Sequence, residues 1–118
     1  MTIRSYRDLK VYQQGMDLVE KIYQISRRFP EDERFGLRDQ IRRASVSVVL
    51  NIAEGYGRKN SEKEFKYFLR NALGSANEVR VILEIASRLR YNIPELEEIQ
   101  QSYENLSKML YSLEARWQ

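Results

Sequence analysis

The chain has 118 residues and a net charge of +3, and its 42% hydrophobic and 31% charged residues fit one globular domain with a modest core. Cysteine and histidine are absent, which excludes disulfides, thiolate or imidazole metal sites, cysteine nucleophiles and the Ser-His-Asp relay. The charge is uneven, because residues 1–59 hold 12 Lys and Arg against 8 Asp and Glu, whereas residues 60–118 hold 8 against 9.

The first of four predicted helices covers about residues 5–29. Ser5 and Asp8 resemble a capping box at its start, and Pro30 prevents its continuation. Apolar residues spaced by three and four predict the stripe that faces the core: Leu9, Tyr12, Met16, Val19 and Tyr23.

The second helix is predicted over about residues 33–54, after an acidic turn, and Gly55 and Gly57 are expected to end it in the left-handed conformation. The third helix is predicted over about residues 61–89, and its start is marked by a clear capping box, Ser61 and Glu64. The fourth covers about residues 94–117 and begins with a proline. Its apolar residues form an uninterrupted heptad seam: Leu96, Ile99, Tyr103, Leu106, Leu110, Leu113 and Trp117.

Four helices joined by short connections predict an all-α fold, an up-down-up-down antiparallel four-helix bundle that spans residues 1–118 as one domain. Only five glycines and two prolines are present, which argues against an all-β fold. The N-terminal segment has no apolar leader, and no stretch approaches the roughly 20 apolar residues of a membrane span. We therefore expect a cytoplasmic protein with no membrane partner.

The second helix has more apolar surface than one bundle requires. One stripe, which includes Ile41, Val48 and Ile52, suits the core of the bundle. A second stripe consists of Val46, Val49, Leu50 and Ala53. Another subunit would cover that second stripe, so the pattern predicts a homo-oligomer. The alternative is that the second helix is central and buried on several sides by its own bundle.

A polar stripe lies between these apolar stripes and includes Gln40, Arg43, Ser47, Asn51 and Glu54. Asn71, Ser75 and Glu78 on the third helix recur at matching spacing. Polar groups next to apolar surface need partners, so we predict either an Arg43–Glu78 ion pair or a hydrogen-bonded network between these stripes, within the subunit or across the interface. A magnesium-dependent hydrolase that uses Glu54 and Glu78 has little support, and we expect no enzymatic activity, no cofactor and no metal.

Two runs of basic side chains recur at helical spacing and predict a surface for an anionic partner. The second helix carries Arg34, Arg38 and Arg42. The turn before the third helix and the first turns of that helix carry Arg58, Lys59, Lys63, Lys66 and Arg70. Like charges at this spacing repel mildly, and the phosphates of RNA or DNA would remove that cost. The alternative is an ordinary solvated surface with intrahelical partners, such as Glu62 for Lys66.

The runs FGLRDQIRRASVSVVLNIAEGYGR (residues 35–58) and FLRNALGSANEV (residues 68–79) resemble the signature of the 23S rRNA-intervening-sequence proteins, a family of four-helix bundles. The family is similar in architecture to the accessory variability determinants of diversity-generating retroelements. Those proteins form homopentamers with a basic surface, bind nucleic acid and associate with a reverse transcriptase. The resemblance implies a cytoplasmic pentamer that acts as a nucleic-acid-binding accessory, with a reverse transcriptase as a candidate partner. A protein–protein interaction scaffold without nucleic-acid binding is the alternative.

Overall fold

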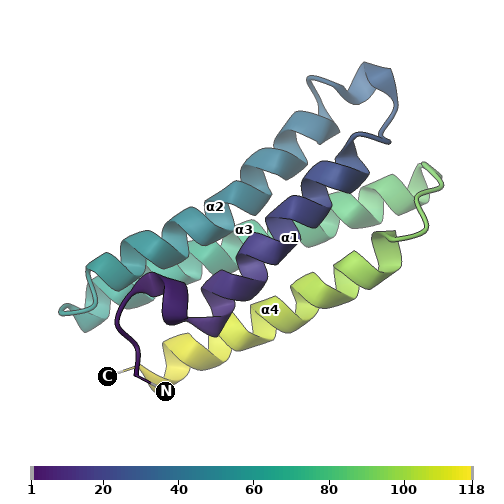
Figure 1. Cartoon of the computed structure of the whole chain (residues 1–118). Coiled ribbons are helices and arrows are strands. Elements are labelled where there is room, and N and C mark those ends of the chain that lie inside the picture. Colours follow the sequence, from purple (N-terminus) through teal and green to yellow (C-terminus); the bar gives the residue numbers. More distant parts are fainter. Residues whose placement is uncertain (1, 118) are drawn as a thin grey trace.

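The computed structural model describes residues 2–117 and contains four long helices (Figure 1). These are α1 (Lys10–Ser26), α2 (Leu37–Gly57), α3 (Glu62–Arg88) and α4 (Leu96–Arg116). Two short 3-10 helices, η1 (Tyr6–Asp8) and η2 (Glu31–Glu33), precede α1 and α2. No strand occurs between residues 2 and 117, so the all-α prediction is confirmed. None of the described helices is long and apolar enough to cross a membrane.

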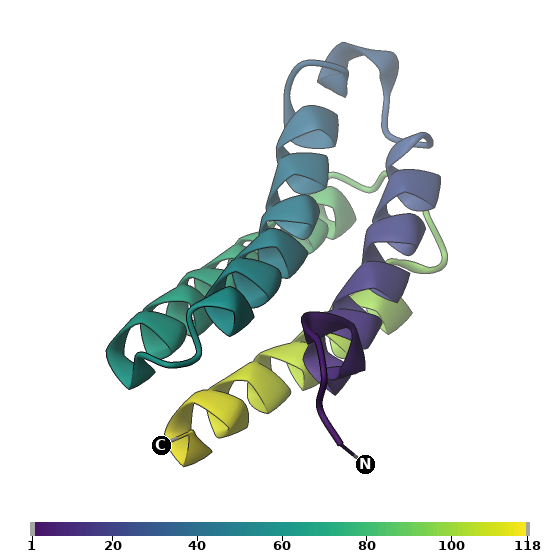
Figure 2. The same cartoon turned by 60° about the vertical axis from the view of Figure 1, so that its left-hand side comes forward.

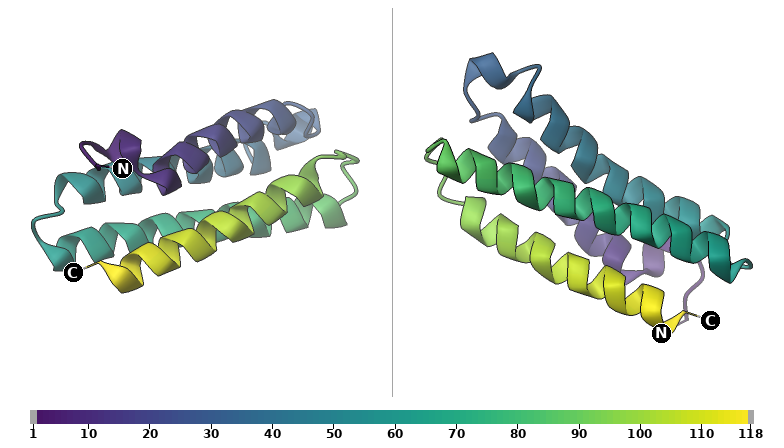
Figure 3. Two further views of the ribbon diagram at one scale, coloured as in Figure 1. Left: turned by 60° about the horizontal axis from the view of Figure 1, so that its bottom comes forward. Right: turned by 180° about the vertical axis from the view of Figure 1, so that it is seen from behind.

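Each long helix packs against two others. Both α1 and α3 contact α2 and α4, and the four helices form a rod of 44 × 24 × 20 Å. The right panel of Figure 3 shows α3 between α2 and α4. Every helix contributes at least one fully buried large side chain to the core, namely Ile22, Ile41, Phe65 and Tyr103. The predicted seam of α4 is confirmed, because its residues from Leu96 to Leu110 are buried.

The core face of α1 differs from the predicted stripe. Val11, Gly15, Leu18, Ile22 and Ile25 are buried, whereas Met16 is 41% exposed. Tyr12, Val19 and Tyr23 of the predicted stripe are only half-buried. The 3.6-residue period was correct but its phase was wrong, because both faces of α1 carry apolar residues and a glycine was not counted as a core position.

The helix starts show how capping signals act. Ser5 and Asp8 form the predicted capping box, but it caps η1, and α1 begins only at Lys10 after an extended Leu9. The backbone amide of Glu64 donates to the side chain of Ser61, the N-cap of α3, as the sequence predicted. The left-handed stop after α3 is Arg90, which directly follows the C-cap Leu89 with a φ of 60° and whose backbone amide donates to the carbonyl oxygen of Ser87. Asn92, where the sequence predicts such a stop, is also left-handed, with a φ of 55°, but it lies beyond the end of the helix.

The Gly55-Tyr56-Gly57 segment does not end α2 through left-handed glycines. No glycine among residues 2–117 has a positive φ, and α2 continues through Gly57. Gly55 is required for close packing instead, because a β-carbon there would lie 2.9 Å from Cβ of Phe68. The glycine thus allows the start of α3 to approach the end of α2.

One end of the rod brings together the N-terminal segment, the α2–α3 connection and the last turns of α4 (Figures 1 and 2). The rings of Phe65 and Trp117 meet edge to face with centroids 4.4 Å apart, and Nε of Arg70 donates to Oε1 of Glu114 at 2.7 Å. We call residues 2–14, 54–70 and 104–117 the terminal end. The α1–α2 and α3–α4 connections lie at the opposite end.

Candidate functional site

A polar network joins α2 to α3, as the sequence predicted. The hydroxyls of Ser47 and Ser75 are 2.8 Å apart. Nδ2 of Asn51 donates to the carbonyl oxygen of Ser47 at 2.9 Å and to its hydroxyl at 3.1 Å. All three side chains are half-buried, so these hydrogen bonds satisfy polar groups that would otherwise be costly at the helix interface.

The Arg43–Glu78 ion pair does not form within the subunit. Nε of Arg43 donates to Oδ2 of Asp39 at 2.9 Å, one turn earlier on the same helix. Oε2 of Glu78 accepts from Nε2 of Gln40 at 3.3 Å instead. The prediction was wrong for the subunit because it did not consider Asp39, four residues before Arg43. A side chain at that spacing lies next to Arg43 on the same helix, so the pair forms without a contact between helices.

The polar network borders an open groove of about 830 Å³ along α2. Val46 and Leu50 give it an apolar strip, and Phe68 of α3 lies on its other side. Polar and charged lining comes from both sides of this strip: Asp39, Arg42, Arg43, Ser47, Asn51 and Glu54, with Tyr23 from α1. The groove lies on the face that the sequence pattern assigned to a second subunit, since Val46 and Leu50 line it.

Only part of the second apolar stripe of α2 is available to another subunit. Leu50 is 62% exposed, whereas Val49 is 6% exposed and packs against Gly15 of α1. Val46 and Ala53 are half-buried. The assignment of Val49 to an oligomer interface is therefore corrected, because α1 already covers it.

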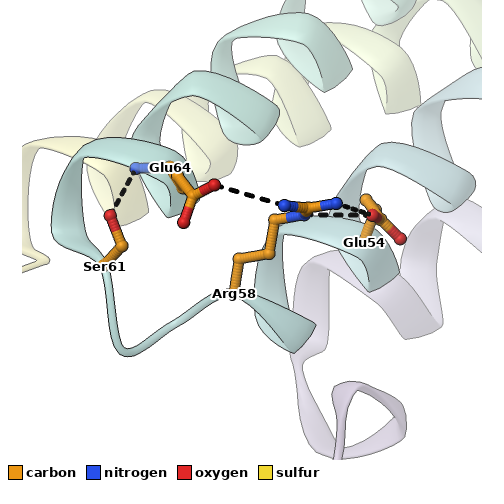
Figure 4. A network of polar contacts seen from close by, with 4 residues as sticks. All are labelled: Glu54, Arg58, Ser61 and Glu64. Atoms are coloured by element: carbon orange, nitrogen blue, oxygen red, sulfur yellow. Dashed lines mark hydrogen bonds and ion pairs between the residues drawn. The ribbon is translucent and has the colours of Figure 1, made fainter.

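The α2–α3 connection holds Arg58 between two carboxylates (Figure 4). Its guanidinium donates to Oε1 of Glu54 at 3.0 Å and to Oε1 of Glu64 at 3.2 Å. The hydrogen bond to Glu54 is the main cause that raises the pKa of Arg58, with a further contribution from Glu64. This network fixes the turn and leaves Arg58 with less unbalanced charge than the sequence implied.

Four predicted basic residues follow this turn, and the structure separates them into two kinds. Lys66 pairs with Glu62 at 2.9 Å, and Arg70 pairs with Glu114 of α4. Lys59 and Lys63 are exposed and form no ion pair with any described residue. Nζ of Lys59 lies 4.2 Å from the centroid of the Tyr56 ring.

The basic run at the start of α2 lies at the opposite end of the rod and is largely used within the subunit. The Arg42 guanidinium donates to Oγ of Ser26 at 2.8 Å and lies 4.6 Å from the centroid of the Tyr23 ring. Arg38 donates to the carbonyl oxygen of Phe29 at 2.8 Å, and its side chain is 16% exposed. Arg34 lies 4.0 Å from Glu31 and remains exposed. Arg38 and Arg42 hold the end of α1 against α2, so they are poor candidates for phosphate contacts.

Further contacts lock this opposite end. The hydroxyl of Tyr91 donates to Oε2 of Glu33 at 2.5 Å, which raises the pKa of Tyr91 to about 12. Oε1 of the same carboxylate accepts from the backbone amide of Leu37 at 3.2 Å and so caps α2. Arg28 forms an ion pair with Glu95, and the hydrogen bond between them lowers the pKa of Glu95.

Five basic residues that the fold gathers at the terminal end were not predicted from the sequence: Arg4, Arg7, Lys10, Lys108 and Arg116. With them, the terminal end holds ten Lys and Arg against six Asp and Glu, whereas the rest of the chain holds ten against eleven. The predicted antiparallel order of the four helices places both termini beside the α2–α3 connection. That order could therefore have shown that these five residues lie near Lys59 and Lys63. Periodicity within one helix does not reveal this surface, because its charges must be added across helix ends.

The catalytic use of Glu54 with Glu78 does not fit the geometry. Glu78 bonds Gln40, which lies 14 residues from Glu54 on α2 and so about 20 Å away along the axis at about 1.5 Å per residue. Among residues 2–117, no group of three Asp or Glu side chains is arranged to hold a metal ion. The two carboxylates cannot act on one substrate bond or one magnesium ion.

Comparisons with known proteins match most of the chain. Residues 7–112 match the family described as 23S rRNA-intervening sequence protein. A solved structure from Bacteroides thetaiotaomicron is described as a protein of unknown function from the S23 ribosomal protein family, and it is 26% identical. It superposes with a TM-score of 0.79 over 88% of this chain and 97% of its own. A comparison with curated proteins gives no match.

Proposed function

The chain belongs to the 23S rRNA-intervening sequence protein family, and from this premise we propose that it is a non-enzymatic accessory protein that binds RNA or DNA. In this proposal it acts in the cytoplasm as a homopentamer of up-down-up-down antiparallel bundles. Contacts to nucleic acid go to phosphates at the terminal end and carry little base specificity. A reverse transcriptase is the protein partner that the architectural resemblance to retroelement accessory proteins adds to the proposal.

The observation that carries this proposal is the uneven charge of the rod. The terminal end has a net charge of +4, from ten Lys and Arg and six Asp and Glu, and the rest of the chain has −1. A cluster of cations on one end raises the local concentration of polyanions and gains free energy from counterion release. Five copies in one assembly would present five such ends, so weak contacts would add through avidity.

The residues proposed to contact phosphates are those of the α2–α3 side of the terminal end: Arg58, Lys59, Lys63, Lys66 and Arg70. Lys59 and Lys63 come first, because they are exposed and have no carboxylate partner among the described residues. The other three must share their charge with Glu54, Glu62, Glu64 or Glu114. Arg34, Arg38 and Arg42 leave the proposed surface, because they lie at the opposite end and two of them are engaged in the α1–α2 junction.

A salt titration with a fluorescent RNA hairpin and a DNA duplex tests the proposal. The double variant Lys59→Gln and Lys63→Gln should weaken binding and reduce the salt slope by about 0.9 for each duplex phosphate that is no longer neutralised. The matched control is Arg27→Gln with Arg88→Gln, which removes two exposed charges outside the terminal end that form no ion pair within residues 2–117. Equal effects of the two double variants would refute a localised surface, and no binding at low salt would refute the function.

Exposed apolar side chains favour the second candidate, a scaffold that binds protein rather than nucleic acid. Leu50, Tyr67 and Val81 are each more than half exposed on α2 and α3. A pull-down from nuclease-treated lysate distinguishes the two candidates, because a protein partner survives nuclease and a nucleic-acid bridge does not.

A further inference from the structure

A second groove of about 590 Å³ lies between the start of α1 and the last turns of α4. Its lining is mainly apolar and includes Leu9, Val11, Met109, Leu113 and Ala115. Within residues 2–117, α4 does not contact α2 and α1 does not contact α3, and this groove shares no lining residue with the groove along α2. Figure 1 shows the two segments side by side at the terminal end.

Three cations border this groove, and none of its lining residues is acidic. Lys10 forms no ion pair with a described residue. Nε of Arg116 donates to the carbonyl oxygen of Ser112 at 3.3 Å, which leaves its charge unbalanced. Lys108 is 3.8 Å from Glu104, a long contact for an exposed pair. The groove thus combines an apolar floor with a rim of three cations, of which only Lys108 has a carboxylate partner among the described residues.

We propose that this groove binds an acidic amphipathic helix of a partner protein. Such a helix presents apolar residues every three to four positions for the floor and carboxylates beside them for Lys10, Lys108 and Arg116. The flexible thioether of Met109 adapts to the partner's side chains. Electrostatic complementarity orients the helix and speeds its association.

The lining chemistry favours a helix over nucleic acid at this position. Phosphates gain nothing from an aliphatic floor, and bases stack on flat rings. Tyr111, 65% exposed, is the one aromatic residue among those that line the groove. Lys10, Lys108 and Arg116 also count towards the charge of the terminal end, but the phosphate contacts of the proposed function are assigned first to Lys59 and Lys63, which do not line this groove.

The test uses the full chain and a fluorescent synthetic peptide of about 18 residues with leucine at helical spacing and flanking glutamates. A second peptide replaces every glutamate with lysine. The acidic peptide should bind and the basic peptide should not. Lys10→Glu with Arg116→Glu should weaken the acidic peptide about tenfold and allow the basic peptide to bind. The Lys59→Gln and Lys63→Gln variant should bind the acidic peptide as the wild type does, with circular dichroism as the folding control.

The methionine methyl groups give an internal control for location. Met109 lies in the groove, whereas Met16 is 41% exposed on α1 outside it. In a chain labelled with ¹³C at methionine methyls, the acidic peptide should shift the Met109 signal and leave Met16 unchanged. Three results would overturn the proposal: no binding of the acidic peptide, a Met109 shift caused by an RNA hairpin instead, or a Met109 shift on raising the protein concentration, which would identify a second copy as the occupant.

Discussion

Gly15 lies directly against Val49, since a β-carbon at residue 15 would come within 2.8 Å of Cγ1 of Val49. Both residues are buried where α1 crosses α2. This contact requires a residue without a side chain at position 15 of α1. The side chain of Val49 is therefore buried within its own subunit and is not available to another one. The close approach explains why the apolar face of α2 is smaller than its sequence predicts.

Replacing Gly15 with alanine should therefore destabilise the protein, although alanine is the better helix former. Overpacking a core costs about 1–3 kcal/mol, and the helix propensity of alanine returns about 1 kcal/mol, so we expect a net loss of about 1 kcal/mol in urea unfolding. Adding Val49→Ala should remove the clash. Gly74→Ala is the matched control, because a β-carbon there meets no atom within 4 Å, and it should stabilise α3. Equal shifts for both glycine variants would contradict the packing argument.

Arg42→Gln should lower the stability of the fold and leave nucleic-acid affinity unaffected. The substitution removes the hydrogen bond to Oγ of Ser26 and the contact with the Tyr23 ring, with an expected loss of about 1–3 kcal/mol. Arg27→Gln makes the same charge change on an exposed residue and should have little effect on unfolding. If Arg42→Gln weakened RNA binding more than Arg27→Gln did, Arg42 would return to the candidate interface.

Tyr103→Phe should stabilise the protein. Tyr103 is fully buried, and its hydroxyl has no hydrogen-bond partner in the structure, so burial raises the pKa of the phenol. Removing an unpaired buried hydroxyl without changing the ring avoids a desolvation cost of about 1 kcal/mol. The check is the midpoint of thermal unfolding, compared with Tyr91→Phe, which removes a hydrogen bond to Glu33 and should unfold at a lower temperature. A lower midpoint for Tyr103→Phe would show that the hydroxyl has a partner.

Much of the fold followed from periodicity and capping signals. The seam of α4, the cap of α3 and a polar network between α2 and α3 were predicted, although the Ser47–Ser75 hydrogen bond in that network was not named in advance. Family membership followed from the long motif at residues 35–58 and its match over residues 7–112. Each of these features depends on residues that are close in the sequence or that face each other on adjacent helices. Spacing along the sequence is enough to predict such features.

The errors arose where the local sequence allowed two assignments and a tertiary contact or a nearer partner decided between them. The two faces of α1 are both apolar, and only the tertiary contact of Gly15 with Val49 selects one. Both Asp39 and Glu78 were possible partners for Arg43, and the ion pair forms with Asp39 on the same helix. Arg38 and Arg42 looked free because their acceptors are backbone carbonyls and a serine at the end of α1, which periodicity does not reveal.

The stability contributed by the Tyr91–Glu33 hydrogen bond should decline at alkaline pH. The pKa of Tyr91 is raised to about 12 from an ordinary value of 10.0, so the folded state retains the proton that the unfolded state loses first. The contribution is therefore complete below pH 10 and is lost as the pH rises towards 12. The difference in unfolding free energy between wild type and Tyr91→Phe, about 1 kcal/mol at pH 7, should shrink across this range. A difference that stays constant up to pH 12 would contradict the role of the phenol proton.

Leu50→Asp should dissociate the proposed pentamer without unfolding its subunits. Leu50 is 62% exposed beside the open groove of α2, so its side chain contributes little to the core of its own bundle. A carboxylate at the centre of an apolar contact between subunits would be buried without a partner, which is strongly unfavourable. Native mass spectrometry should detect monomers at micromolar concentration, and circular dichroism should show unchanged helix content. Leu89→Asp is the control, because Leu89 is 52% exposed at the far end of α3 and should leave the assembly intact. A monomeric wild type, or a Leu50→Asp variant that remains assembled, would exclude α2 as the interface.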